Sequence, residues 1–223
     1  KLEATTADYL QQSVPGFDME APHYWANNVL ADGVTAADLT VSEPTLIGWL
    51  HTLEAISQLC MASARYRAAA NYARRVLKAE GYPTRAAGTV LLALARLEDQ
   101  NGFFALAHQL EEQVGADALE NSPWYLLART ILLFKTNKMR PATRALREFA
   151  NRCEGGAFFL LNPMYQTPYL PCRPEPRDPW DLSHQAVWEA DGIISDTPDF
   201  APWANACEDV SQLAQEFARR YGF

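Results

Sequence analysis

The stretch NSPWYLLARTIL, residues 121–132, decides the fold of this chain. Ser122-Pro123 is a helix-start signal, because proline is tolerated in the first turn of a helix. Apolar residues then recur every three or four positions, the spacing of one helix face: Trp124, Leu127, Ala128, Ile131 and Leu132. The stretch therefore predicts a helix with one buried side.

The same spacing recurs on both sides of this stretch, between residues 44 and 150. Glu43-Pro44 is a suitable helix start, and Gly81-Tyr82-Pro83 is a strong stop. Six helices are expected in this part of the chain, with approximate bounds 44–60, 66–77, 85–100, 103–114, 121–132 and 140–149.

The six predicted helices pair into three hairpins whose apolar patterns are similar. The proposed equivalent positions are Leu53, Leu91 and Trp124 on the first helices, then Tyr66, Phe104 and Met139, followed by Ala69, Ala107 and Ala142, on the second helices. A small residue lets two helices approach closely, and a larger neighbour fills the groove beside it. A repeat of this length is typical of stacked helix pairs that share a continuous core.

These hairpins resemble the tetratricopeptide repeat family. The residues that carry the resemblance are Trp124, Leu127, Ala128 and Ile131 on a first helix, and the three alanines of the second helices. Glu98 departs from the pattern, which has an apolar residue there, and the loop before Met139 is longer than the pattern allows. The resemblance implies an all-α fold: a solenoid of about three antiparallel helical hairpins over residues 44–153.

The family resemblance also implies an inner groove that is lined by the first helices and binds a peptide or protein segment. By position, this groove would present His51, Glu54, Gln58, Arg96, Asp99, Tyr125 and Arg129. Arg96 and Arg129 could each hold a carboxylate through two hydrogen bonds, and Tyr125 could pack against an apolar side chain.

The segments outside the repeat differ from it in composition. Residues 1–43 are expected to form an N-terminal arm or cap with one or two short helices. Six of the fourteen prolines lie between Pro163 and Pro179, so residues 154–181 are expected to be extended, either as a strap over the solenoid or as a presented ligand. Residues 182–223 are expected to return to helix, ending in a helix that caps the solenoid.

Short motifs in this C-terminal part resemble bacterial tetratricopeptide-like relatives of the suppressor-of-tumorigenicity-7 family. They are Asn162-Pro163, Pro168-Tyr169-Leu170 and Thr197-Pro198-Asp199-Phe200 with Trp203. This resemblance implies an interaction scaffold and no particular reaction.

Charge is unevenly distributed along the chain, whose formal net charge is −8. The net charge is −6 over residues 1–43, +4 over 44–150 and −6 over 151–223. The basic middle favours docking of an acidic segment, although solvated faces that happen to differ would give the same pattern. The acidic net charge disfavours nucleic acid as the main partner, and no apolar run reaches the ~20 residues of a membrane span.

The basic residues of the repeat gather on its second helices. They are Arg67, Arg74, Arg75 and Lys78 on one helix, and Arg140, Arg144 and Arg147 on another. A solvated face, a docking site for an acidic protein segment and an RNA contact are the three interpretations. Aromatic residues that would stack on bases are not interleaved with these arginines, which disfavours RNA.

Catalytic motifs are absent from the sequence, which has no H-E-x-x-H and no phosphate-binding loop. The four scattered cysteines give no zinc framework and, together with the absence of a signal-peptide pattern, favour a cytoplasmic location. We therefore expect a non-enzymatic protein–protein interaction module, a scaffold, adaptor or chaperone without cofactor or metal, that binds a peptide or protein segment in the repeat groove or under the strap. The alternatives are a hydrolase or metal enzyme that uses His184 with Glu189 or Asp191, with or without Cys172 or Cys207, and a structural subunit of a larger assembly.

Overall fold

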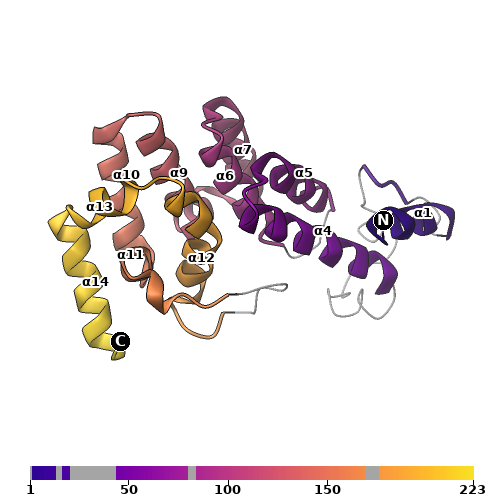
Figure 1. Cartoon of the computed structure of the whole chain (residues 1–223). Helices are drawn as coiled ribbons and strands as arrows, with labels where there is room; N and C mark the ends of the chain where they lie inside the picture. Colours follow the sequence, from indigo (N-terminus) through magenta and orange to yellow (C-terminus); the bar gives the residue numbers. More distant parts are fainter. Residues whose placement is uncertain (1, 14–16, 21–43, 80–83, 169–175) are drawn as a thin grey trace.

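The computed structural model describes the chain except for residue 1 and residues 14–16, 21–43, 80–83 and 169–175. The described residues form α-helices and one short 3-10 helix, without a β-strand, so the fold is all-α as expected (Figure 1). The repeat part contains α4 (Pro44–Ala62), α5 (Tyr66–Leu77), α6 (Ala86–Arg96), α7 (Gln100–Val114), α8 (Ala116–Glu120), α9 (Pro123–Lys135) and α10 (Met139–Arg152). Before it lies α1 (Leu2–Ser13), and after it lie α11 (Gly156–Leu161), η1 (Pro163–Tyr165), α12 (Asp181–Ser195), α13 (Phe200–Asn205) and α14 (Glu208–Tyr221). No described helix is both long enough and apolar enough to cross a bilayer.

Three turns of the same geometry join α4 to α5, α6 to α7 and α9 to α10. Each has one non-glycine residue in the left-handed region: Ala64 and Glu98 at φ +58° and Asn137 at φ +57°. In each turn the N–H of this residue donates to the carbonyl three residues earlier, and the next N–H donates to the carbonyl five residues earlier. This is the bond pattern of a Schellman helix end, which satisfies the last carbonyls of the first helix. The chain thus repeats one turn design three times.

Helix α6 lies at the centre of the repeat part, packed against α5 on one side and α9 on the other. It is therefore buried almost all round, from Ala86 to Ala95. Its approach to α9 depends on Gly88, because a Cβ atom at this position would lie 2.3 Å from Cγ of Trp124. The five apolar residues predicted for the first face of α9 are all buried.

The shared turns correct the predicted alignment of the second helices. Counted from each turn, the equivalent residues are Ala69 on α5, Phe103 on α7 and Ala142 on α10, and each donates its N–H to the helix's N-cap carbonyl. The alignment of Ala107 with Ala69 and Ala142 is therefore wrong by one helical turn. Phe104, which was expected to fill the groove, is 45% exposed, whereas Phe103 is fully buried.

The alignment of the first helices is also wrong. Leu53, Leu91 and Trp124 lie eleven, seven and thirteen residues before the left-handed residue of their turns, so they are not equivalent positions. All three side chains are nevertheless buried. Their burial was predictable from apolar spacing, which places a residue on a face without giving its height along the helix.

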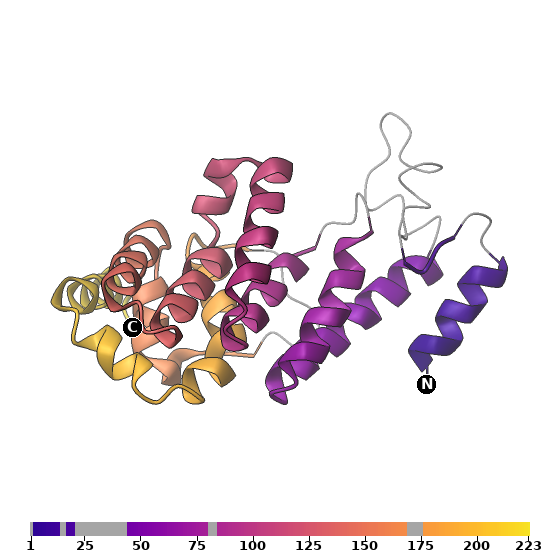
Figure 2. The same cartoon turned by 90° about the horizontal axis from the view of Figure 1, so that it is seen from above.

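The helix pair α6–α7 is less closely packed than the pairs α4–α5 and α9–α10. Helix α7 packs against α6 less extensively than α5 packs against α4 or α10 against α9. Only Phe103 and Ala107 of α7 are buried. Figure 2 shows α7 and α8 projecting from the row of helices.

The C-terminal helices cover one side and one end of the repeat part. Helix α12 packs against α9, α4 and α6, and α14 packs against α11 and α10. In Figure 1, α14 lies at the opposite end of the molecule from α1. Helix α1 packs on α4, where Glu3 accepts a hydrogen bond from Trp49 Nε1 and forms an ion pair with Arg75 at 2.7 Å.

The expectation of an extended segment over 154–181 is wrong for its first part. Gly155 adopts φ +73°, and α11 begins immediately after it. Helix α11 buries Phe158, Phe159 and Leu160 and ends at Leu161, before the first proline of the run. Proline density therefore disfavours helix only from Pro163 onward. Residues 169–175, which include Cys172, and most of the predicted N-terminal arm lie outside the described residues.

Candidate functional site

The residues that were expected to line the inner groove do not form one open line. On α4, His51 is exposed, Glu54 is half-buried and hydrogen-bonded to Thr84, and Gln58 is only 5% exposed. Asp99 accepts a hydrogen bond from the Gly102 N–H and so caps the N-terminus of α7.

The other three predicted groove residues interact within the chain. Arg129 forms an ion pair with Glu148 of α10, with 2.9 Å between Nη1 and Oε2. Tyr125 stacks on Phe103, with ring centroids 6.0 Å apart. Arg96 pairs with Asp196 at the end of α12, at 3.1 Å. The two guanidinium groups and the tyrosine ring that were expected to bind a partner therefore already interact within the chain.

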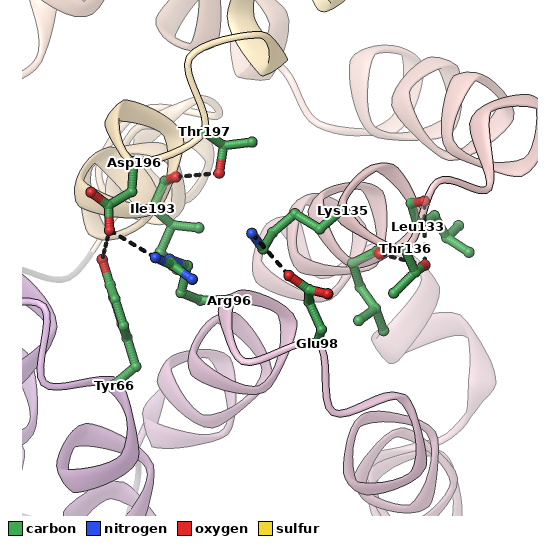
Figure 3. Close-up of polar contacts among 10 residues, drawn as sticks. Tyr66, Arg96, Glu98, Leu133, Lys135, Thr136, Ile193, Asp196 and Thr197 are labelled. Atoms are coloured by element: carbon green, nitrogen blue, oxygen red, sulfur yellow. Dashed lines mark hydrogen bonds and ion pairs between the residues drawn. The ribbon is translucent and has the colours of Figure 1, made fainter.

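Figure 3 shows Asp196, at the end of α12, facing Tyr66 of α5 and Arg96 of α6. The Asp196 carboxylate accepts hydrogen bonds from Arg96 and, at 3.5 Å, from the Tyr66 hydroxyl. The Arg96 guanidinium also lies 5.3 Å from the centroid of the Tyr66 ring, in cation–π geometry. The same view shows Glu98 of the second turn paired with Lys135 of α9 at 3.3 Å.

A buried carboxylate fixes the middle of α12 against α6 and α9. Glu189 accepts hydrogen bonds from Trp124 Nε1, at 2.7 Å, and from the Thr89 hydroxyl. One turn earlier, Gln185 accepts a hydrogen bond from Arg85 Nη1 at 3.1 Å. Buried polar groups are costly unless they are hydrogen-bonded, so these contacts specify how α12 is seated. The helices that were expected to line an open groove, α4, α6 and α9, are thus packed against a helix of the same chain.

The hydrolase or metal-site alternative depended on His184 with Glu189 or Asp191. His184 is buried against Phe159, with ring centroids 4.4 Å apart, and its Nε2 accepts the N–H of Thr167. Burial lowers the pKa of His184, and the nearby Asp181 carboxylate offsets this effect in part. Glu189 is five positions after His184, so it leaves α12 on a different face. The exposed Asp191 is seven positions after His184, which puts almost two helical turns between them. The helix geometry therefore does not present these groups as one acid–base pair.

The described residues contain no cluster of three or more His, Cys, Asp or Glu side chains that could hold a metal ion. Cys60, Cys153 and Cys207 are free thiols. Burial raises the pKa of Cys153 to about 12, which disfavours the reactive thiolate.

An open cleft of about 390 Å³ lies between α5 and the turn from α6 into α7. We call it the α5 cleft, and it is lined by Arg67, Ala70, Asn71, Arg74, Leu94, Leu97 and Asp99. Two smaller hollows, of about 210 and 130 Å³, lie beside α14. The α5 cleft stays open because, among the described residues, α5 packs extensively against α4 and α6 but not against α7.

The rim of the α5 cleft carries two arginines whose charge is not used within the described part of the chain. Arg67 and Arg74 are exposed and form no ion pair there. Their neighbours on α5 differ, because Arg75 pairs with Glu3 and Lys78 with Glu20. The basic pattern of the sequence had marked this helix as one possible docking face. It gave no sign that Leu94 and Leu97 would lie beside the arginines.

Comparison of the chain with protein-family models, curated proteins and solved structures finds no match in any of the three.

Proposed function

We propose that this chain is a non-catalytic protein-binding module, built on a tetratricopeptide-like stack of three helical hairpins. It would bind a segment of a partner protein in the α5 cleft. The three identical turns support the repeat architecture, since they recur at matching places between paired helices. The partner's segment would not occupy the inner side of α6 and α9, because α12 already covers it.

The observation that carries this proposal is the composition of the α5 cleft. Its floor is apolar, with Ala70 and Leu94 buried and Leu97 37% exposed. Its rim is polar, and the exposed guanidinium groups of Arg67 and Arg74 there can donate hydrogen bonds to a ligand. Recognition sites on proteins commonly combine an apolar centre with a few polar groups that fix orientation.

The experiment that tests the proposal is to block the cleft and measure partner capture from a native extract. Asn71→Trp places a large ring over the cleft from an exposed position on α5, so it removes no internal contact. Gln109→Trp is the matched control, because Gln109 is exposed on α7 and does not line the cleft.

We expect a saturable partner that is captured by the parent chain and by Gln109→Trp and is lost with Asn71→Trp. Both variants should melt within about 2 °C of the parent chain, because exposed substitutions typically change stability by ~0.5 kcal/mol or less. Equal capture by both variants would refute binding in the α5 cleft. Absence of any saturable partner would count against the function itself.

A further inference from the structure

We propose that the α5 cleft binds an acidic, extended segment of the partner, with two carboxylates as far apart as two turns of α5 are long. One carboxylate would bind Arg67 and the other Arg74. This inference rests on the proposed function and adds the chemistry of the occupant.

The spacing of the two arginines sets the spacing of the ligand. Arg67 and Arg74 are seven positions apart on α5, which is close to two full turns of the helix. Both side chains therefore leave the helix on the same side, where they line one cleft. A helical turn rises about 5.4 Å. An extended chain in the polyproline II conformation has three residues per turn and rises about 3.1 Å per residue, so acidic residues three positions apart point to the same side and span nearly the same length as the two turns.

The groups between the arginines fit the middle of such a segment. Asn71 lies on the same face, four residues after Arg67, and its amide can both donate to and accept from a peptide backbone. Leu97, which is partly exposed, offers an apolar surface for a side chain between the two acids, and the buried Leu94 also lines the cleft.

The carboxylate of Asp99 makes the two sides of the cleft opposite in charge, with the arginines on the α5 side. It lies at the α7 end of the cleft, where it caps the helix through the Gly102 N–H. A negative group there disfavours a ligand carboxylate nearby, although the positive end of the α7 dipole weakens this effect. The acids of the ligand are therefore aligned along α5, and its neutral residues face the turn into α7.

Charge complementarity selects an acidic partner over other occupants. The chain as a whole carries a formal charge of −8, and six of its arginines already pair with acids among the described residues. Within that part of the chain, Arg67 and Arg74 keep their charge available on one cleft. A guanidinium binds a carboxylate through two parallel hydrogen bonds, which suits it to an acidic side chain.

The test uses fluorescence anisotropy with the full chain and a labelled, end-blocked peptide, Gly-Glu-Leu-Val-Glu-Gly. A second peptide has Gln in place of both Glu, and a third has the two Glu adjacent. We expect the first peptide to bind about tenfold more tightly than the Gln peptide, and several-fold more tightly than the peptide with adjacent acids. Raising the salt concentration from 0.05 to 0.5 M should weaken its binding, because screening reduces exposed ion pairs.

Two double variants separate a specific site from general charge. Arg67→Ala with Arg74→Ala should weaken binding of the acidic peptide about tenfold, the size expected for two partly exposed ion pairs. Arg140→Ala with Arg144→Ala removes the same charge from exposed positions on α10, outside the cleft, and should change binding less than twofold.

Equal loss in the two double variants, or equal binding of the Glu and Gln peptides, would overturn the inference. So would failure of all three peptides to bind. If the peptides fail while Asn71→Trp still abolishes partner capture, the protein-binding function stands and only the acidic occupant is wrong. If Asn71→Trp leaves capture unchanged, the cleft itself is the wrong site.

Discussion

Phe103 stands on α7 at the position that Ala69 occupies on α5. Each side chain is fully buried, and each residue lies five positions after the left-handed residue of its turn. Alanine at this place lets the second helix approach the first closely, whereas a phenylalanine ring must be accommodated between helices. We expect this difference to be the reason why α7 packs less closely on α6 and leaves uncovered the face of α5 that forms the cleft.

The third hairpin offers a direct test of this explanation, since Ala142 takes the same position on α10. Ala142 is fully buried in a cluster with Leu133 and Ala145. Ala142→Phe should therefore overpack the α9–α10 contact and lower the free energy of unfolding by about 3 kcal/mol. Urea denaturation followed by circular dichroism measures the change.

The matched control is Arg144→Phe, which adds the same ring at an exposed position of α10. It should change stability by no more than ~0.5 kcal/mol. A neutral Ala142→Phe would show that this position tolerates a ring, and the size of residue 103 would then not explain the seating of α7.

Gly88→Ala should lower the free energy of unfolding, although helix propensity alone predicts that it would raise it. In an exposed helix, replacing glycine by alanine stabilises by about 1 kcal/mol. At Gly88 the new Cβ would lie 2.3 Å from Cγ of Trp124, whose indole N–H is fixed by Glu189. We expect a loss of about 2 kcal/mol in the same denaturation assay. Gly48→Ala, where a Cβ meets nothing within 4 Å, is the control and should be neutral or stabilising.

Local patterns predicted most of the helices but not the register between them. All six predicted repeat helices match observed ones to within four residues at each end, because a buried face imposes its spacing on the sequence. Register depends on where each turn falls, and here the turns use Ala64, Glu98 and Asn137 in a conformation that glycine usually supplies. Asparagine sometimes takes this place, but Ala64 and Glu98 give no signal of a left-handed turn, so the pattern of the second helices was aligned one helical turn out of place.

The seating of α12 could not be predicted from local patterns either. It depends on Glu189 meeting Trp124 and Thr89, residues that are 65 and 100 positions away in the sequence. A lone acid within an apolar helix face is usually interpreted as solvated, and here it is buried. The inner groove was therefore expected to be open. The arginines of α5 were visible in the sequence, but their apolar neighbours come from the end of another helix.

The structure separates the role of Arg96 from that of Arg67. Arg96 pairs with Asp196 and lies over the ring of Tyr66, so Arg96→Ala should lower the free energy of unfolding by about 1 kcal/mol. The difference should shrink in 1 M salt, since Asp196 is half-exposed. Arg67→Ala, by contrast, should leave stability unchanged within ~0.5 kcal/mol and affect only ligand binding. Denaturation curves of both variants at low and high salt decide the matter, and equal stability losses would refute the separation.

The burial of His184 predicts how stability changes with pH. Because burial lowers the pKa of His184 in the folded chain, the unfolded chain takes up a proton first as the pH falls through about 6.5. Linkage then requires that the contribution of His184 to the free energy of unfolding be fully present above pH 6.5 and decline as the pH falls below it. His184→Gln keeps an acceptor for the Thr167 N–H but cannot titrate, so its stability should decline less between pH 7.5 and 5.0 than that of the parent chain. Parallel curves for the parent chain and His184→Gln would mean that His184 is not held neutral by burial.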